Sequence, residues 1–402
     1  MELSIGEKGV QLKEYLANLL AYGLAGDHQI ALWRRPKEKK VEIILDNEAP
    51  TWVNPTIEDL PSGFLLHPFQ ETPEKKALLI QAKNYYSLEL DQPALSIHEE
   101  GPWPNKEIGP AKLEELLVEK TGIRNKNSQS GNHNITRKAD FLKTVNKGVE
   151  AIEKGELFKV VPAKVKSAEL PGHFDLVATL LHLFEAYPNS FVNFFHIPQV
   201  GTWVGATPEV LIQTKENFFY TMSLAGTQKA KGDNPIKTAG WTQKEIEEQA
   251  MVSRYIVNCF KKIRLREYDE IGPKTSLAGE LLHLRSDFKV DMDATNFPQL
   301  GSVMLDLLHP TSAVCGMPKE KALEFIATHE KFDRSFFAGY LGPVNIQQET
   351  ALFVNLRCAQ FQGKRILLYA GAGVTADSEP DQEWEETELK CDVIGKHLKT
   401  RK

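Results

Sequence analysis

YAGAGVTADSEPDQEWEETELK, residues 369–390, carries the strongest signal in this chain: a strand-like segment and a glycine-rich turn lead into a helix-like segment with Glu383 and Glu386. A second pair, Glu245 and Glu248, lies far upstream in the helix-like stretch 242–260, TQKEIEEQAMVSRYIVNCF. Residues three apart share one face of an α-helix, so each pair can present two carboxylates to one point. Four converging carboxylates suit Mg²⁺, which prefers oxygen ligands. The alternative is two solvated helix faces.

Composition indicates a large globular protein. The 402 residues are 42% hydrophobic and 25% charged, enough to bury a substantial core in one large domain or in two to three smaller ones. The net charge of −6 argues against a nucleic-acid partner. No run approaches the roughly 18 apolar residues of a membrane span, and the first residues lack a basic region followed by an apolar one, so we expect a cytoplasmic protein. The cysteines are scattered without CxxC spacing, which favours buried free thiols over disulfides or zinc.

Hydrophobic patterning predicts both strands and helices. Alternation indicates strands at 40–46, 76–83 and 217–226, and helical periodicity indicates helices at 140–155, 175–187 and 320–332. The polar, basic stretch 120–140 is either a link between two parts of the chain or a surface loop within one domain. Residues 1–125 contain no recognisable motif, and every motif lies in residues 126–402.

Eight segments, in order, resemble the chorismate-utilising enzymes: the isochorismate and salicylate synthases and the large subunits of anthranilate and aminodeoxychorismate synthases. They are GELFKVVPAK (155–164), GATPEVLI (205–212), SLAGTQ (223–228), KEIEEQ (244–249), LLHPTSAVCGMP (307–318), FDRSFFAGYLGPV (332–344), NLRCAQ (355–360) and residues 369–390. The resemblance implies an α+β fold, a single large domain with two packed antiparallel β-sheets and helices outside. Residues 1–125 would be the N-terminal lobe of that fold and residues 126–402 its chorismate-binding catalytic core.

The resemblance implies an acid and a base for the chemistry. Lys159 lies in the apolar, strand-like FKVVPAK, where burial would favour the neutral amine that a general base needs. Glu209 follows a proline in a turn after the strand-like GTWVGA. In isochorismate synthases the matching lysine activates water and the matching glutamate protonates the departing hydroxyl. Taken singly, Lys159 also fits a surface charge and Glu209 an ordinary turn residue.

The implied substrate is chorismate, a dianion. By resemblance, Glu248 and Glu386 bind Mg²⁺ directly, while Glu245 and Glu383 hold its waters or complete the coordination sphere, and the ion grips the ring carboxylate. An arginine fork suits the second, enolpyruvyl carboxylate. The residues implied to contact the substrate are Ala225, Gly226, Thr227, His309, Ala313, Gly339, Arg357, Tyr369, Gly371, Ala372, Gly373 and Lys390. In isolation, His309 and the GAG triplet also fit purely structural roles.

Ala313 favours water over ammonia as the nucleophile, because the members that add ammonia or eliminate pyruvate usually carry threonine there. The chain departs from the family pattern at Lys164, usually arginine, at Gln249, often histidine, and at Glu245, aspartate in many isochorismate synthases. The alternatives are a salicylate synthase, an ammonia-using synthase component, or a non-catalytic chorismate-binding regulator. We expect no obligatory protein partner.

Overall fold

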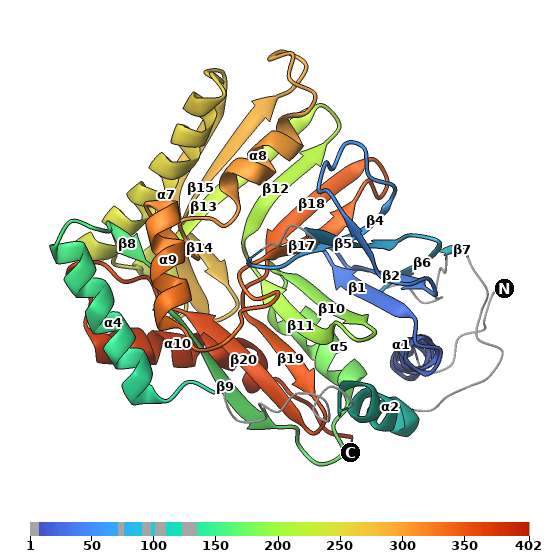
Figure 1. Cartoon of the computed structure of the whole chain (residues 1–402). Helices are drawn as coiled ribbons and strands as arrows, with labels where there is room; N and C mark the ends of the chain where they lie inside the picture. The colour runs from blue at the N-terminus through green and yellow to red at the C-terminus, as the bar shows by residue number, and fades with distance from the viewer. Residues whose placement is uncertain (1–7, 71–75, 91–97, 101–109, 123–134, 402) are drawn as a thin grey trace.

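A computed structural model of the chain describes residues 8–70, 76–90, 98–100, 110–122 and 135–401. Its framework is two large antiparallel β-sheets (Figure 1). The first sheet contains, in spatial order, β7 (His98–Glu100), β6 (Asn84–Glu89), β2 (Lys40–Asp46), β1 (Gln29–Arg34), β10 (Phe191–Ile197), β11 (Gly201–Thr207), β19 (Cys358–Gln362), β20 (Arg365–Gly371) and β9 (Ala163–Glu169).

The second sheet has the same number of strands among the described residues. It contains, in spatial order, β14 (Asp269–Ala278), β15 (Leu281–Asp291), β13 (Phe218–Lys229), β12 (Val210–Lys215), β18 (Glu349–Val354), β17 (Tyr340–Val344), β4 (Gly63–His67), β5 (Ala77–Gln81) and β3 (Thr51–Val53). A small ladder pairs β8 (Lys159–Val160) with β16 (Gly316–Met317). The sequence-based fold class, α+β with two packed antiparallel sheets, is confirmed.

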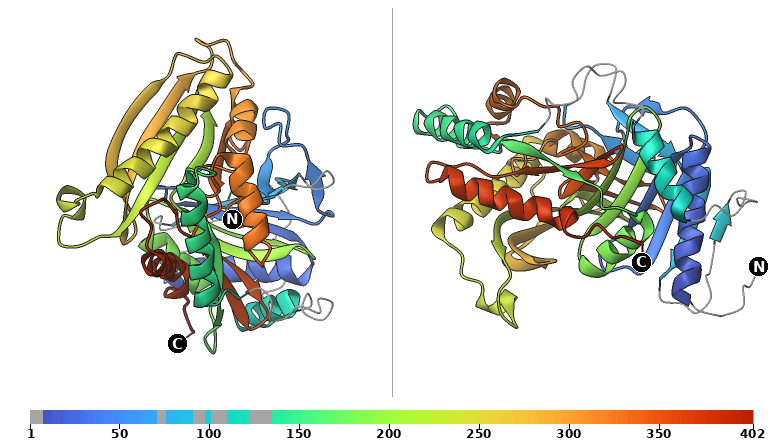
Figure 2. Two further views of the ribbon diagram at one scale, coloured as in Figure 1. Left: turned by 60° about the vertical axis from the view of Figure 1, so that its left-hand side comes forward. Right: turned by 90° about the horizontal axis from the view of Figure 1, so that it is seen from below.

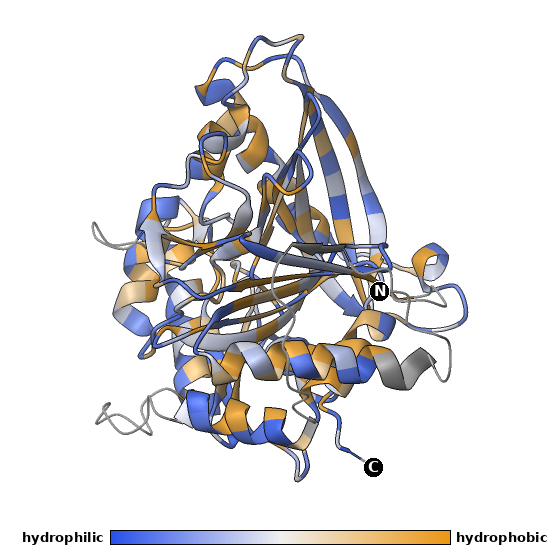
Figure 3. Ribbon diagram, turned by 90° about the vertical axis from the view of Figure 1, so that its right-hand side faces the viewer, coloured by the Kyte–Doolittle hydropathy of each residue, from blue (hydrophilic) through white to orange (hydrophobic). Residues whose placement is uncertain are grey.

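Strand alternation divides the core into two layers. On β10, Phe191 and Phe195 face the second sheet, while Val192 and Phe194 face the helices on the other side. The ring of Phe191 stacks on Phe353 of β18 with centroids 4.1 Å apart, which places the two sheets face to face. Figure 3 shows the hydrophobic residues concentrated on the interior strands, whereas the outer helices carry both hydrophobic and hydrophilic positions.

The helices lie on the outside of the two sheets. They are α1 (Lys8–Ala25), α2 (Pro110–Gly122), α4 (Lys138–Glu153), α5 (Leu176–Ala186), α6 (Pro235–Thr238), α7 (Gln243–Lys262), α8 (Leu300–Leu308), α9 (Lys319–His329) and α10 (Pro380–Gly395). Figures 1 and 2 place α1, α2 and α5 together against the first sheet, and α4, α9 and α10 together at the opposite side of the molecule. No helix among the described residues has the length and apolarity needed to cross a membrane.

The N-terminal part of the chain contributes to both sheets. Strand β1 pairs with β10 in the first sheet, and β4 pairs with β17 in the second. The boundary predicted between residues 125 and 126, like most of the proposed link, lies outside the described residues, so the division into lobe and core stays a prediction.

The six predicted elements all exist with ends shifted by zero to three residues: β2, β5, β13, α4, α5 and α9. The four cysteines are free and buried, as the sequence predicts: Cys259, Cys315, Cys358 and Cys391.

Candidate active site

Strands of both sheets and the helices α7 and α10 surround one pocket. Its lining residues are Val161, Glu209, Leu224, Ala225, Gly226, Thr227, Glu248, His283, Ala313, Val314, Phe337, Leu356, Arg357, Gly371, Gly373, Glu386 and Lys390. Most of the residues singled out from the sequence therefore line this pocket. They come from distant segments: Glu209 and Lys390, for example, are 181 positions apart. Convergence of polar groups from many elements on one concave site is typical of an active site.

Lys159 lies at the edge of this pocket, fully buried on the short strand β8. Its Nζ donates to Glu248 Oε1 at 2.6 Å. Burial raises the pKa of Glu248, but the charge and hydrogen bond of Lys159 outweigh it, so the pKa is lowered overall. Gly373 is packed against this ion pair, because a Cβ there would lie 2.6 Å from Glu248 Oε1 and 3.0 Å from Lys159 Cε. A side chain in place of the second glycine of the GAG triplet would therefore displace the Glu248 carboxylate or Lys159.

Glu209 is the buried carboxyl group of the pocket. It follows Thr207, the last residue of β11, in the turn that the sequence predicts, and is 4% exposed. Burial raises its pKa to about 7, even though the positive charges of Arg357, Lys159 and Lys390 oppose the shift. A carboxyl group that titrates near neutral pH is suited to donate a proton to a leaving group.

Local sequence features explain where the two helices that carry the glutamate pairs begin and which residues α10 buries. Helix α7 begins with a capping box, in which Thr242 and Glu245 satisfy each other's backbone N–H groups. Helix α10 begins with Pro380 at its first turn and buries Glu383, Thr387 and Lys390 along one face, at spacings of four and three residues. Glu248 and Glu386 both reach the pocket from these helices.

Each of the four glutamates has a partner within the chain. Glu383 Oε1 accepts from Lys244 Nζ at 2.6 Å, and Glu386 Oε1 pairs with Lys390 Nζ at 2.5 Å. Glu248 pairs with Lys159, as described above. Glu245 instead accepts from the backbone N–H of Thr242 at 2.7 Å, which directs it toward the start of its own helix. Three lysines therefore balance three of the carboxylates.

The donor set fits a hard divalent cation in part. Among the described residues, no three acidic, histidine or cysteine side chains are arranged around one metal position. However, Glu383 Oε2 is buried and has no hydrogen-bond partner, which leaves a carboxylate oxygen to accept a cation. Burial and the nearby charge of Glu386 raise the pKa of Glu383, against the effect of Lys244. A cation beside Glu383 and Glu386 would relieve this repulsion, whereas in this structure Glu248, Glu383 and Glu386 are each paired with a lysine and are not arranged around one metal position.

Positive groups and backbone donors also line the pocket, beside its carboxylates. Arg357 is 9% exposed, at a backbone φ of 49° between β18 and β19, and burial lowers its pKa despite the nearby Glu386 and Glu209. Lys390 Nζ also donates to the carbonyl of Gly371 at 2.8 Å. The N–H of Gly226 donates to Glu248 Oε2 at 3.3 Å. Such a site can bind an organic anion.

Four of the residues implied to contact the substrate do not line the pocket. His309 packs in a buried aromatic cluster, 4.7 Å from His67 and 4.9 Å from Tyr340 between ring centroids. A Cβ on Gly339 would meet the backbone oxygen of His67 at 2.0 Å, so this glycine permits chain packing. The hydroxyl of Tyr369 donates to Gln360 at 3.3 Å. Ala372 is fully buried, and its N–H donates to Pro162. Their substrate contacts stay predictions.

His283 is a pocket residue that sequence reasoning missed. It lies on β15, is 3% exposed, and its Nδ1–H donates to the Gly226 carbonyl oxygen, 2.7 Å away. Burial lowers its pKa to about 3, so the ring is neutral. Its Nε2 has no hydrogen-bond partner. In the sequence it is one inward position of an alternating strand, with nothing to distinguish it from a structural histidine.

Gln249, a departure from the family pattern, has a structural role. Its amide nitrogen donates to Ser223 Oγ at 2.8 Å and Ser286 Oγ at 3.3 Å, which joins α7 to β13 and β15. The residue is 2% exposed and lies beside Glu248 on the same helix. It therefore fixes the helix that carries the pocket glutamate.

Comparison with known proteins agrees with this geometry. The sequence model of a family described as "Chorismate binding enzyme" matches residues 105–399. The chain belongs to the chorismate-binding enzymes. That match extends through every motif quoted above and begins before the first of them, within the N-terminal third of the chain.

Curated relatives of this chorismate-binding enzyme include isochorismate synthases. Escherichia coli MenF is 26% identical over 258 residues, which span 63% of this chain and 59% of MenF. Escherichia coli EntC is 27% identical over 274 residues, covering 65% of this chain and 69% of EntC. The solved structure of E. coli MenF aligns with a TM-score of 0.68 at 21% identity, covering 94% of this chain and 91% of that one. At that identity the structural match establishes the fold alone.

Proposed function

We propose that this chain is an isochorismate synthase, which converts chorismate to isochorismate with Mg²⁺. The observation that carries the proposal is the presence of two buried groups at one pocket. They are Lys159, which is fully buried, and Glu209, whose pKa burial raises to about 7. An acid and a base are needed together because one hydroxyl leaves and one water enters. A binding protein without catalysis has no use for both.

The proposed reaction is a reversible substitution on the ring. Lys159 takes a proton from a water molecule, whose oxygen bonds to ring carbon 2; both ring double bonds shift, and the hydroxyl on carbon 4 leaves with a proton from Glu209. Lys159 can act as the base only as the neutral amine, since the ammonium form has no lone pair. The ion pair with Glu248 favours the ammonium form, so the mechanism requires Glu248 to engage another partner and the ammonium to release its proton to solvent before water is activated.

The anionic groups of the substrate have candidate partners among the residues that line the pocket. Arg357, Lys390 and the backbone near Gly226 support binding of a carboxylate through charge-assisted hydrogen bonds. Glu248, Glu383 and Glu386 are the proposed Mg²⁺ ligands; the bound ion would neutralise the ring carboxylate and fix its orientation. Glu245 is proposed to help only through water, since its carboxylate caps α7.

Water is the proposed nucleophile because Ala313 lines the pocket where ammonia-using relatives usually have threonine. Similar isochorismate synthases are named for different pathways, among them a vibriobactin-specific isochorismate synthase of Vibrio cholerae, 31% identical over 196 residues that span 48% of this chain and 49% of that one. Menaquinone and siderophore synthesis are both proposed destinations for the product. A cytoplasmic location and the absence of an obligatory protein partner are predictions from sequence.

The deciding experiment is incubation of the purified chain with chorismate and Mg²⁺, without ammonium, followed by chromatographic separation of the products. A new isomer peak that settles at equilibrium with chorismate, and is absent with chelator, is expected. Salicylate with pyruvate would instead indicate a salicylate synthase. Reaction only after ammonium is added would indicate an anthranilate- or aminodeoxychorismate-forming component, and binding without turnover a regulator.

A further inference from the structure

A second cavity, of about 570 Å³, lies between helix α4 and the end of α9, and is called the α4 cavity below. Its lining residues are Ile135, Thr136, Arg137, Asp140, Phe141, Lys143, Thr144, Lys147, Ala163, Thr328, His329, Glu330, Lys331 and Phe332. None of these residues lines the candidate active site. The volume is that of a small-molecule site.

Three lysines of the α4 cavity have no counter-charge. Lys143 and Lys147 are exposed on α4, and Lys331 is exposed shortly after α9. Within the described part of the chain, none of the three forms an ion pair or a side-chain hydrogen bond. Residues 123–134, which precede the first lining residue in the sequence, contain no aspartate or glutamate.

The two carboxylates of the lining are already neutralised. Asp140 Oδ2 accepts from Arg137 Nε at 2.7 Å, and Glu330 Oε2 accepts from Nε of the buried Arg334 at 2.8 Å. These ion pairs leave the three lysines as excess positive charge, although the whole chain has a net charge of −6.

The three lysines lie near one another. Lys143 and Lys147 are four positions apart on α4, so their Cβ atoms are about 5–6 Å apart. The hydrogen bond and charge of Arg137 lower the pKa of Asp140, and the charges of Lys331 and Lys143 lower it further, so both lysines lie near this one carboxylate. Like charges at this spacing destabilise a helix, and an anion bound between them would remove that cost.

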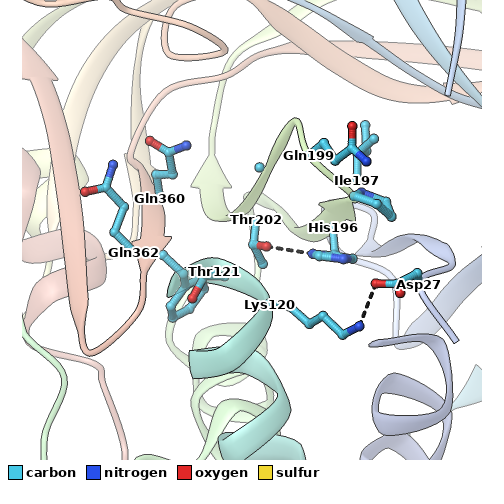
Figure 4. A pocket seen from close by; sticks show the side chains of 12 residues that line it. Asp27, Lys120, Thr121, His196, Ile197, Gln199, Thr202, Gln360 and Gln362 are labelled. Atoms are coloured by element: carbon cyan, nitrogen blue, oxygen red, sulfur yellow. Dashed lines mark hydrogen bonds and ion pairs between the residues drawn. The ribbon is translucent and has the colours of Figure 1, made fainter. Parts of the chain in front are cut away.

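The cavity drawn in Figure 4, at the ends of β10 and β11, has a different charge pattern. Its Lys120 pairs with Asp27 at 2.6 Å, and these two residues carry the charges of its lining at neutral pH, because burial lowers the pKa of His196 to about 4. An anion would lose hydration in either cavity. Only beside α4 would it gain cations that lack a partner among the described residues.

The lining favours phosphate over carboxylate. An arginine fork suits a planar carboxylate, but both Oδ atoms of Asp140 already occupy the fork of Arg137. Lysines bind phosphate as point charges, and several can share the oxygens of one tetrahedral group. The half-buried ring of Phe332 adds apolar surface to the lining.

We propose that the α4 cavity binds an organic phosphate, with the phosphate group among Lys143, Lys147 and Lys331 and the apolar part beside Phe332. The proposal does not depend on the proposed reaction, because these residues do not line the active site.

The test uses the full chain and 1-naphthyl phosphate as probe, in titration calorimetry at low ionic strength without chorismate. The triple variant Lys143→Gln/Lys147→Gln/Lys331→Gln should weaken binding of the probe at least about tenfold, since three ion pairs are lost together. The matched control is Lys154→Gln/Lys321→Gln/Lys364→Gln, which makes the same change in net charge at exposed lysines outside the α4 cavity. It should bind the probe like the unaltered chain, and any binding at the active site is common to both variants.

Two further probes test the chemistry of the ligand. Neutral 1-naphthol should show no binding that depends on the three cavity lysines, and 2,6-naphthalenedicarboxylate should bind through them at least about threefold more weakly than the phosphate. Added salt should weaken binding of the phosphate, because the lysines are exposed.

The proposal is overturned if 1-naphthyl phosphate does not bind up to its solubility limit, or if both triple variants lose binding equally. Tighter lysine-dependent binding of the dicarboxylate would overturn the assignment to phosphate. All six substituted lysines are exposed, so the variants should keep the fold, which circular dichroism checks.

Discussion

At the residue scale, the protonation of Glu209 should set the pH range of activity. The carboxyl group is protonated below about pH 7 and ionised above it, because burial raises its pKa to about 7. As a general acid it works in the protonated form, so turnover should fall as pH rises through about 7. Glu209→Gln should lower turnover by roughly 10²–10⁴-fold and remove this alkaline limb. Both are measured from the pH dependence of kcat with chorismate.

Lys159→Ala should lower turnover by a similar factor, about 10²–10⁴, through loss of the base. Circular dichroism is the control for folding in both variants. Near-normal kcat in either one would remove that residue from the catalytic step, whatever the product of the reaction.

Lys244 donates a hydrogen bond to one carboxylate oxygen of Glu383, a proposed metal ligand. Removing the lysine side chain should therefore strengthen cation binding. In Lys244→Met, the buried Glu383 would lose its 2.6 Å partner and keep the repulsion from Glu386. Mg²⁺ affinity, measured by calorimetry without substrate, should rise by about tenfold, which corresponds to roughly 1.4 kcal/mol. Lys396→Met, which removes an exposed lysine paired with Glu280, is the matched control. Unchanged affinity in Lys244→Met would argue against Glu383 as a ligand.

At the scale of elements, Lys164 fixes α10 to β9. Its side chain is fully buried, with Nζ 3.3 Å from the centroid of the Trp384 ring and in an ion pair with Glu388. Glu388 lies on α10 between Glu386 and Lys390, so this contact positions two pocket residues. Lys164→Met should lower the free energy of unfolding by about 1–2 kcal/mol. This loss is smaller than that for a fully buried ion pair, because Glu388 retains its ion pair with Lys166.

Lys164→Met should also raise the KM for chorismate. Lys164→Arg, which introduces the usual family residue, should have the KM of the unaltered chain. Lys166→Met removes the more exposed partner of the same glutamate and should change stability by no more than about 0–1 kcal/mol. Urea unfolding and steady-state kinetics measure the two effects. If Lys164→Met and Lys166→Met proved equivalent, the buried lysine would have no special role in placing α10.

At the scale of the whole molecule, Arg35 joins the two sheets. It bonds Glu42 of β2 at 3.1 Å and Glu349 of β18 at 2.6 Å, and all three side chains are at most 13% exposed. Arg35→Met would leave two carboxylates buried between the sheets without this shared cation. The free energy of unfolding should fall by about 3 kcal/mol in urea titrations at neutral pH. Lys112→Met, at an exposed ion pair on α2, should leave it unchanged.

The predicted strands and helices, including the two helices that carry the glutamate pairs, could be read from the local hydrophobic pattern of the sequence. Alternation and helical periodicity depend on which face of a segment is apolar, and that is written in neighbouring residues. The strand β2 was therefore predicted with its observed ends, and Glu383 and Lys390 were placed on the helix that buries them. The resemblance identified Lys159 and Glu209 before either could be placed in space.

Only the tertiary structure determined which residues share the pocket. His283 enters it and His309 does not, because the fold brings β15 to the site and turns His309 toward His67. The pairing of each carboxylate with a lysine or a cap likewise depends on segments far apart in sequence. Local pattern fixes the faces of helices and strands, whereas distances between side chains are fixed only by how the two sheets pack.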